Sequence, residues 1–155
     1  MAYTNFSWIV PGLAQGAYPG KHPGPPTEGF HVADVIVFCA EEKQPPKGYR
    51  APAGKLVLRV PFDDDIYRPV PPEVGQIFHE VAASTARYLK SGAKVLSTCA
   101  MGLNRSGVIT SLTLMHAHGM QPNDVIRLIR GRRHKDALMN PMFEQFIRQQ
   151  RVRGR

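Results

Sequence analysis

The chain has 155 residues, 43% of them hydrophobic and 21% charged, which are ordinary proportions for one soluble globular domain. Two cysteines cannot make a disulfide framework, and no apolar run approaches the roughly 20 residues needed to span a bilayer. The N-terminal sequence MAYTNFSWIV lacks the basic start and apolar core of a signal peptide. We therefore expect a cytoplasmic, monomeric domain with no membrane partner, whose cysteines stay reduced.

The net charge of +8 is concentrated towards the C-terminus. Residues 121–155 carry nine Lys or Arg against three Asp or Glu, a net charge of +6 for this segment. Such a segment is typical of a solvated helical face with a basic tail, and we assign residues 1–150 to the domain and 151–155 to the tail. It also suits a phosphorylated or nucleic-acid partner, and charge alone does not separate the two interpretations.

Strand and helix patterns alternate along the chain. Residues 17–29 are dense in Gly and Pro and predict a surface loop, whereas ADVIVFCA (33–40) and KLVLRVPF (55–62) predict strands. Prolines at 69–72 and Gly92 bound a predicted helix, AKVLST (93–98) predicts a third strand, and residues 104–119 predict a largely apolar helix. PNDVIRLIRGRR and NPMFEQFIRQQ predict two further amphipathic helices. The pattern indicates an α/β domain with a mostly parallel central sheet of about four to five strands flanked by helices.

The turn TCAMGLNRSG (98–107) lies between the third predicted strand and the apolar helix, where parallel sheets bind ligands. A helix start and a guanidinium both stabilise a thiolate, so Cys99 beside Arg105 is a candidate nucleophile. Gly102 permits the chain to curl, Arg105 can grip two phosphate oxygens, and Ser106 can donate a hydrogen bond to the sulfur. The candidate phosphate-binding loop consists of Ala100, Met101, Gly102, Leu103, Asn104 and Arg105.

The string VLSTCAMGLNRSG resembles the Cys-x5-Arg-Ser signature of cysteine-dependent protein tyrosine phosphatases, most closely the compact dual-specificity type. Weaker similarity extends over WIVPGLAQGAYP (8–19), which is similar to the family's opening strand and turn, DVIVFCAEE, and the closing RGRRHKDALMNPMFEQFI. In that last segment Asn140 and Phe143 stand where such domains pack their final helix. The resemblance implies hydrolysis of phosphotyrosine on a protein or peptide substrate, and it leaves open whether phosphoserine and phosphothreonine are also hydrolysed. It implies a cysteinyl-phosphate intermediate and no metal or other cofactor.

The same resemblance implies a general acid on a loop some thirty-odd residues before the cysteine. The matching stretch, RVPFDDDIYRPVP (59–71), offers Asp63, Asp64 and Asp65. Strand alternation continues the face of Phe62 onto Asp64, whereas the other two point away. We therefore expect Asp64 to be the acid, with Asp65 as the alternative.

Two residues depart from the family pattern. Thr98 stands where the family usually has histidine, although its hydroxyl could donate a hydrogen bond. Asn104 before Arg105 is similar to the Gly-x-Asn-Arg of RNA 5′-triphosphatases of capping enzymes, so that activity is the alternative function. A non-catalytic phosphate-binding module is a third possibility, although such modules usually lack the cysteine or the arginine.

The remaining candidate ligands and thiols are expected to be structural. His116 and His118 are two residues apart and do not face each other on a helix, so we expect no metal site there. Cys39 lies in an apolar strand and is expected to be an inert core thiol.

Overall fold

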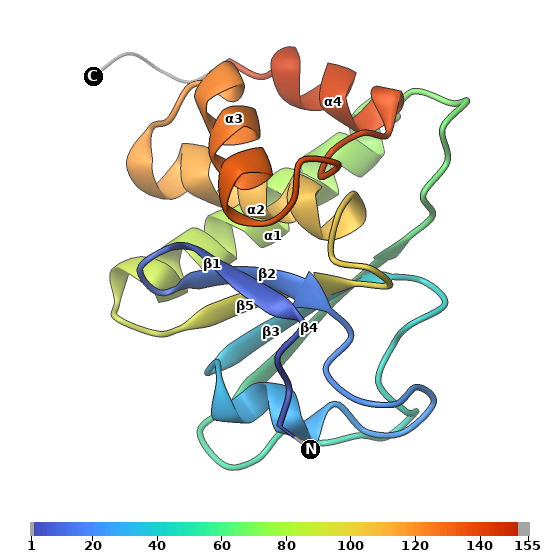
Figure 1. Ribbon diagram of the computed structural model, residues 1–155, viewed down its shortest axis with the longest axis vertical. Helices are drawn as coiled ribbons and strands as arrows, with labels where there is room; N and C mark the ends of the chain where they lie inside the picture. Colours follow the sequence, from blue (N-terminus) through green and yellow to red (C-terminus); the bar gives the residue numbers. More distant parts are fainter. Residues whose placement is uncertain (1, 152–155) are drawn as a thin grey trace.

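A five-stranded sheet forms the centre of the protein in the computed structural model, which describes residues 2–151 (Figure 1). Its strands follow the order β1-β2-β5-β3-β4. The β2–β5, β5–β3 and β3–β4 pairs are parallel, and β1 is antiparallel to β2. This confirms the predicted α/β class and mostly parallel sheet. The strands are β1 (Phe6–Val10), β2 (Leu13–Ala17), β3 (Val35–Ala40), β4 (Leu56–Phe62) and β5 (Val95–Cys99).

Within residues 2–151, four α-helices cover one face of the sheet, and a short 3-10 helix with its adjoining loops covers the other (Figure 1). Successive residues of β3 serve the two faces in turn, because neighbouring side chains of a strand point to opposite sides. Val37 packs in the cluster beneath the α-helices, whereas Ile36 and Phe38 pack against the 3-10 helix and its loops. The helices are η1 (Thr27–His31), α1 (Pro72–Lys90), α2 (Arg105–His118), α3 (Pro122–Arg132) and α4 (Pro141–Arg148).

Helix α2 runs through the interior, because every residue from its start to Met115 is buried. It packs along α1, where the hydroxyls of Thr85 and Thr113 are 2.6 Å apart. Gly119 ends α2 in the left-handed conformation with φ 64°, which a glycine adopts without strain. The buried helix holds its first residue, Arg105, firmly against the end of β5.

The N-terminal segment differs from the expected single strand and turn. Residues 6–17 form a hairpin of two strands, β1 and β2, joined through Gly12 at φ 86°. The third predicted strand is also displaced, because β5 begins at Val95 and ends with Cys99 itself. No helix within residues 2–151 is both long and apolar enough to cross a membrane. Most of the predicted basic tail, residues 152–155, lies outside the described residues.

Candidate active site

Cys99 ends the central strand β5, between the ends of β2 and β3, and its side chain is buried. Its sulfur is 3.2 Å from the Ser106 hydroxyl, with which it forms a hydrogen bond. Ser106 lies in the first turn of α2, and its carbonyl accepts a hydrogen bond from Ser97 Oγ at 3.1 Å. Strand β5 and helix α2 thus hold the thiol and the hydroxyl together, with the thiol as the donor.

The loop from Cys99 to Arg105 has backbone N–H groups that are not used in hydrogen bonds of turns or loops. The loop and turn hydrogen bonds within residues 2–151 include none donated by the N–H groups of residues 100–104. Gly102 has φ +73°, and a Cβ on it would lie 2.3 Å from the backbone carbonyl carbon of Gly16. Any larger residue would therefore push the loop away from β2. Successive unpaired N–H groups in such a curl are suited to an anion.

Arg105 lies at the end of the loop and forms a bidentate pair with Glu42. Its Nη1 and Nη2 donate to the two carboxylate oxygens of Glu42 at 2.5 and 2.6 Å, and Nη1 also donates to Phe62 O at 3.1 Å. Its Nε is buried without a hydrogen-bond partner. Glu42 therefore occupies the end of the guanidinium fork, and the side that carries Nε is free to receive an oxyanion.

The ion pair between Glu42 and Arg105 shifts the pKa of both groups towards their charged forms. The hydrogen bond from Arg105 holds the pKa of Glu42 at about 2, although partial burial opposes the shift. Burial alone would lower the pKa of Arg105, but the hydrogen bond and charge of Glu42 raise it overall. The depressed pKa of Glu42 means that the pair is intact above about pH 4.5 and is lost only as the pH falls towards 2.

Replacing Glu42 by Gln should lower kcat/KM for a small aryl phosphate about tenfold, because one Nη group of Arg105 then loses its charged acceptor. The measurement is steady-state kinetics at pH 6 to 8, where Glu42 is ionised in the wild type. Glu41→Gln at the exposed neighbouring position is the matched control and should leave kcat/KM unchanged. Higher activity in Glu42→Gln would instead mean that Glu42 blocks the site.

Asp64 lies on the loop after β4 and is held by two asparagine side chains. Its Oδ2 accepts a hydrogen bond from Asn104 Nδ2 at 3.1 Å, and its Oδ1 accepts one from Asn140 Nδ2 at 2.6 Å. Asn104 Oδ1 in turn accepts the backbone N–H of Asn140 at 3.1 Å. This network ties the loop after β4 to the phosphate loop and to the start of α4.

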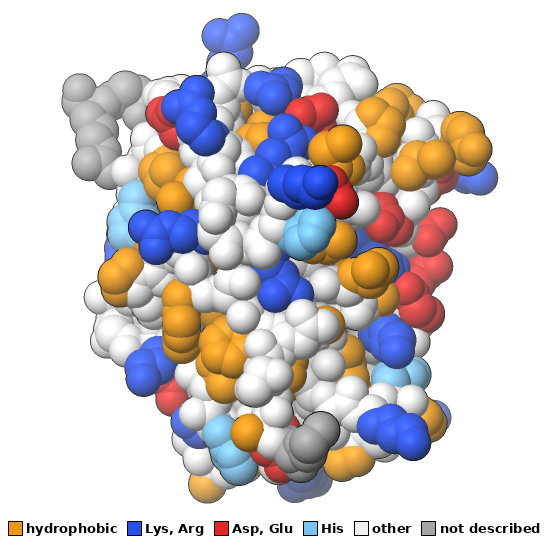
Figure 2. All heavy atoms as spheres, viewed as in Figure 1, with side chains coloured by type: hydrophobic (Ala, Val, Ile, Leu, Met, Phe, Trp, Pro, Cys, Tyr) orange, Lys and Arg blue, Asp and Glu red, His pale blue; other side chains and the backbone are white. Residues whose placement is uncertain are grey.

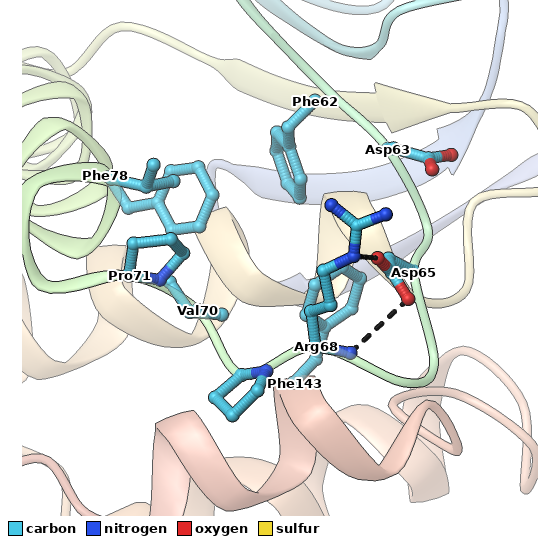
Figure 3. A pocket seen from close by; sticks show the side chains of 10 residues that line it. Phe62, Asp63, Asp65, Arg68, Val70, Pro71, Phe78 and Phe143 are labelled. Carbon is cyan, nitrogen blue, oxygen red and sulfur yellow. Dashed lines mark hydrogen bonds and ion pairs between the residues drawn. The ribbon is translucent and has the colours of Figure 1, made fainter.

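The neighbouring acids serve the turn itself. Asp65 Oδ1 accepts the backbone N–H groups of Tyr67 and Arg68 at 2.8 and 3.3 Å, and its carboxylate pairs with the Arg68 side chain. Figure 3 shows this pair at the mouth of an apolar pocket, while Asp63 points away from the Phe62 ring. Of the three acids, Asp64 is therefore the one that contacts the phosphate loop.

Three contacts at the site were not anticipated from the sequence. Thr98 Oγ1 donates to Val37 O at 2.9 Å, so its hydroxyl supports β3 and does not bond to the Cys99 sulfur. The sequence alone did not indicate a role for Glu42. Its position just after β3 is nevertheless a usable signal, because ligands bind at the carboxyl ends of parallel strands and β3 lies beside β5. Asn140 was predicted only to help pack the last helix, yet its side chain also contacts Asp64.

Acidic side chains gather along one edge of the molecule, over the loops that follow β3 and β4, whereas basic ones are scattered over the whole of this face (Figure 2). Away from the site, burial lowers the pKa of His116, and repulsion from His79 and Lys90 lowers it further. Its Nε2 is 3.0 Å from Nδ1 of His79. Within residues 2–151, no three His, Cys, Asp or Glu side chains are grouped so as to hold a metal ion.

Cys39 is fully buried beneath the helices, and this burial raises the pKa of its thiol. Its sulfur is 3.8 Å from Ser97 Oγ. These properties agree with the inert core thiol predicted for this position.

Comparison with solved structures supports the fold. A mouse putative dual specificity phosphatase, crystallised with zinc tungstate, superposes with a TM-score of 0.74 at 22% identity, covering 92% of this chain and 84% of that one. Human DUSP28 superposes with a TM-score of 0.73 at 19% identity, covering 95% and 94% of the two chains. At these identities the likeness shows a shared fold.

Sequence comparison identifies the family. The dual specificity protein phosphatase 1B of Arabidopsis thaliana is 32% identical over 101 residues, which cover 61% of this chain and 60% of that protein. The match thus spans about three fifths of the length of this curated relative. The family model for the dual specificity phosphatase catalytic domain matches residues 20–152, nearly the whole chain. The chain therefore belongs to the family of dual specificity phosphatase catalytic domains.

Proposed function

We propose that this protein hydrolyses phosphomonoesters on proteins: phosphotyrosine, and also phosphoserine and phosphothreonine. The Cys99 thiolate attacks phosphorus, the bond to the ester oxygen breaks, and Asp64 gives its proton to the leaving oxygen. Arg105 and the N–H groups of residues 100–105 hold the phosphoryl oxygens while charge builds on them. The product of this step is cysteinyl phosphate at Cys99.

A water molecule then completes the cycle. Its oxygen attacks phosphorus, Asp64 takes a proton from it, and the sulfur–phosphorus bond breaks to release inorganic phosphate. The Ser106 hydroxyl, 3.2 Å from the sulfur, donates a hydrogen bond to the departing thiolate. The reaction uses no metal and no cofactor, and a cytoplasmic location would keep the Cys99 thiol reduced.

The observation that carries this proposal is the 3.1 Å hydrogen bond between Asn104 and Asp64. It brings a carboxylate to the rim of the loop that contains the nucleophile and the phosphate-binding arginine. An acid at this place can protonate an alkoxide or phenolate leaving group, which a phosphate monoester on a protein requires. The same bond offers a role for Asn104 in phosphomonoester hydrolysis: it holds the acid Asp64. An RNA triphosphate substrate is not needed to explain this asparagine.

One kinetic panel tests the proposal against its alternatives. Phosphate release would be measured from phosphotyrosine, phosphoserine and phosphothreonine peptides and from 5′-triphosphorylated RNA. Light scattering on the same preparation would test the expected monomeric state. We expect hydrolysis of the peptides, led by phosphotyrosine, and little release from the RNA. Faster release from the RNA would favour the 5′-triphosphatase alternative. Tight phosphopeptide binding without turnover would indicate a non-catalytic module.

A further inference from the structure

Arg133, the residue that directly follows α3, donates hydrogen bonds to two backbone carbonyls of the phosphate loop. Its Nε donates to Gly102 O at 3.1 Å, and its Nη2 donates to Met101 O at 3.1 Å. Nη2 also donates to Asn5 Oδ1 at 2.8 Å, and Nη1 donates to Ser7 Oγ at 3.4 Å. A single guanidinium therefore joins the loop to β1 and to the segment before it.

The two loop carbonyls matter because each belongs to a planar peptide unit that also carries an N–H group. The carbonyl of Met101 shares its unit with the N–H of Gly102, and the carbonyl of Gly102 shares its unit with the N–H of Leu103. In a trans peptide the two groups point in opposite directions. A donor that draws both carbonyls outward therefore turns both N–H groups inward, to the side where an oxyanion would bind.

Gln15 supports the same loop from β2. Its Nε2 donates to Gly102 O at 3.0 Å and lies 3.4 Å from Leu103 O, and the whole side chain is buried. The Gly102 carbonyl thus accepts from two side chains, one on β2 and one just after α3. Arg133 is the partner that also reaches the Met101 carbonyl, and this peptide unit, which carries the N–H of Gly102, has no hydrogen bond from Gln15.

The charge of Arg133 suits a supporting role. Burial lowers the pKa of Arg133, while attraction to Tyr3 and Cys99 raises it, and a guanidinium stays charged at neutral pH in any case. Its Nε and both Nη atoms donate to protein oxygens. All three guanidinium nitrogens of Arg133 therefore contact the phosphate loop or the N-terminal segment.

We propose that Arg133 is a positioning residue: it holds the Met101 and Gly102 carbonyls outward, so that the N–H groups of Gly102 and Leu103 stay aimed at the phosphoryl oxygens. Its effect on turnover rests on the proposed function. Its effect on oxyanion binding does not, because an anion can bind to a loop that catalyses nothing.

The test compares Arg133→Ala with two matched controls. Arg132→Ala removes the same charge from the exposed neighbouring residue, and Asn5→Ala removes the N-terminal partner of Arg133 but leaves its loop contacts. For each variant, tungstate affinity would be measured by calorimetry, kcat and KM with p-nitrophenyl phosphate, and folding by Tm. We expect Arg133→Ala to weaken tungstate binding and to lower kcat/KM by about tenfold to hundredfold each. Both controls should stay within about twofold of the wild type.

Arg133→Lys provides a second arm in case the alanine variant does not fold. One ammonium cannot copy the planar fork, so we expect faster amide hydrogen exchange at Gly102 and Leu103 together with weaker tungstate binding. Added guanidinium ion should partly restore kcat/KM in Arg133→Ala but not in Arg132→Ala. Tungstate affinity and exchange equal to the wild type in Arg133→Lys, or equal effects of Arg133→Ala and Asn5→Ala, would overturn the proposal.

The experiment separates this inference from the proposed function. If the wild type hydrolyses no phosphomonoester, the proposed function fails, and the tungstate comparison between Arg133→Ala and Arg132→Ala still decides the role of Arg133. Weaker tungstate binding in Arg133→Ala alone would then support the positioning role, and equal binding would refute it.

Discussion

Replacing Cys99 by Ser is expected to abolish hydrolysis of p-nitrophenyl phosphate, with kcat falling by at least about 10⁴-fold. A hydroxyl at this position is a far weaker nucleophile than the thiolate, so the covalent intermediate should form far more slowly. The variant should still fold and bind tungstate, because Arg105 and the loop N–H groups are unchanged. Phosphate release and tungstate affinity measured on one preparation check both expectations.

Cys39 offers the matched control, because the chain contains only these two cysteines. It is buried beneath the helices, so Cys39→Ser should lower Tm while leaving kcat close to that of the wild type. Acid-quenched mass spectrometry of the wild type with substrate should show one phosphate on a peptide that contains Cys99. Full activity in Cys99→Ser, or a phosphate trapped on Cys39, would refute the assignment of the nucleophile.

Replacing Asp64 by Ala is expected to have an effect that depends on the leaving group. For phenyl phosphate, whose phenolate is a poor leaving group, kcat/KM should fall about 10²- to 10⁴-fold, because protonation of the oxygen is lost. For p-nitrophenyl phosphate the loss should be less than about tenfold, because its phenolate departs without a proton. The measurement is kcat/KM across a series of aryl phosphates of graded phenol acidity.

Variants of the two adjacent acids distinguish loss of the general acid from loss of the loop structure. Asp63→Ala removes a carboxylate that accepts the backbone N–H of Asp64 at 2.8 Å but does not contact the asparagines, so any loss should be small and similar for all leaving groups. Asp65→Ala removes the acceptor for the Tyr67 and Arg68 backbone, so it should slow all leaving groups to a similar extent. A steeper dependence on the leaving group in Asp65→Ala than in Asp64→Ala would assign the acid to Asp65.

The two departures from the family motif have different structural explanations. Thr98 bonds to the backbone of β3 and leaves the environment of the sulfur to Ser106 and the loop. Asn104 bonds to Asp64, so the residue that suggested an RNA substrate instead connects the loop to the acid. Residue type alone could not decide between these roles, because an asparagine side chain both donates and accepts.

The sequence by itself determined the parts of this protein that are contiguous in the chain. Strand β5, the loop and α2 follow one another without interruption, so apolar runs, a curl-permitting glycine and the Cys99–Arg105 spacing were enough to predict them. Alternation along β4 likewise indicated Asp64, because a strand's side chains point in a fixed order. The hairpin at residues 6–17 was only half predicted, since pairing depends on a neighbour as well as on the strand.

Only the tertiary structure decided what surrounds those residues. Arg105 meets Glu42 from 63 positions away, Asp64 meets Asn140 from 76, and Arg133 meets Gly102 from 31. These contacts follow from the strand order, which places the end of β3 beside β5 and the end of β4 beside β3, and from the packing of α3 and α4 against α2. No local pattern carries that information, because it arises from how separate elements bury their apolar faces against one another.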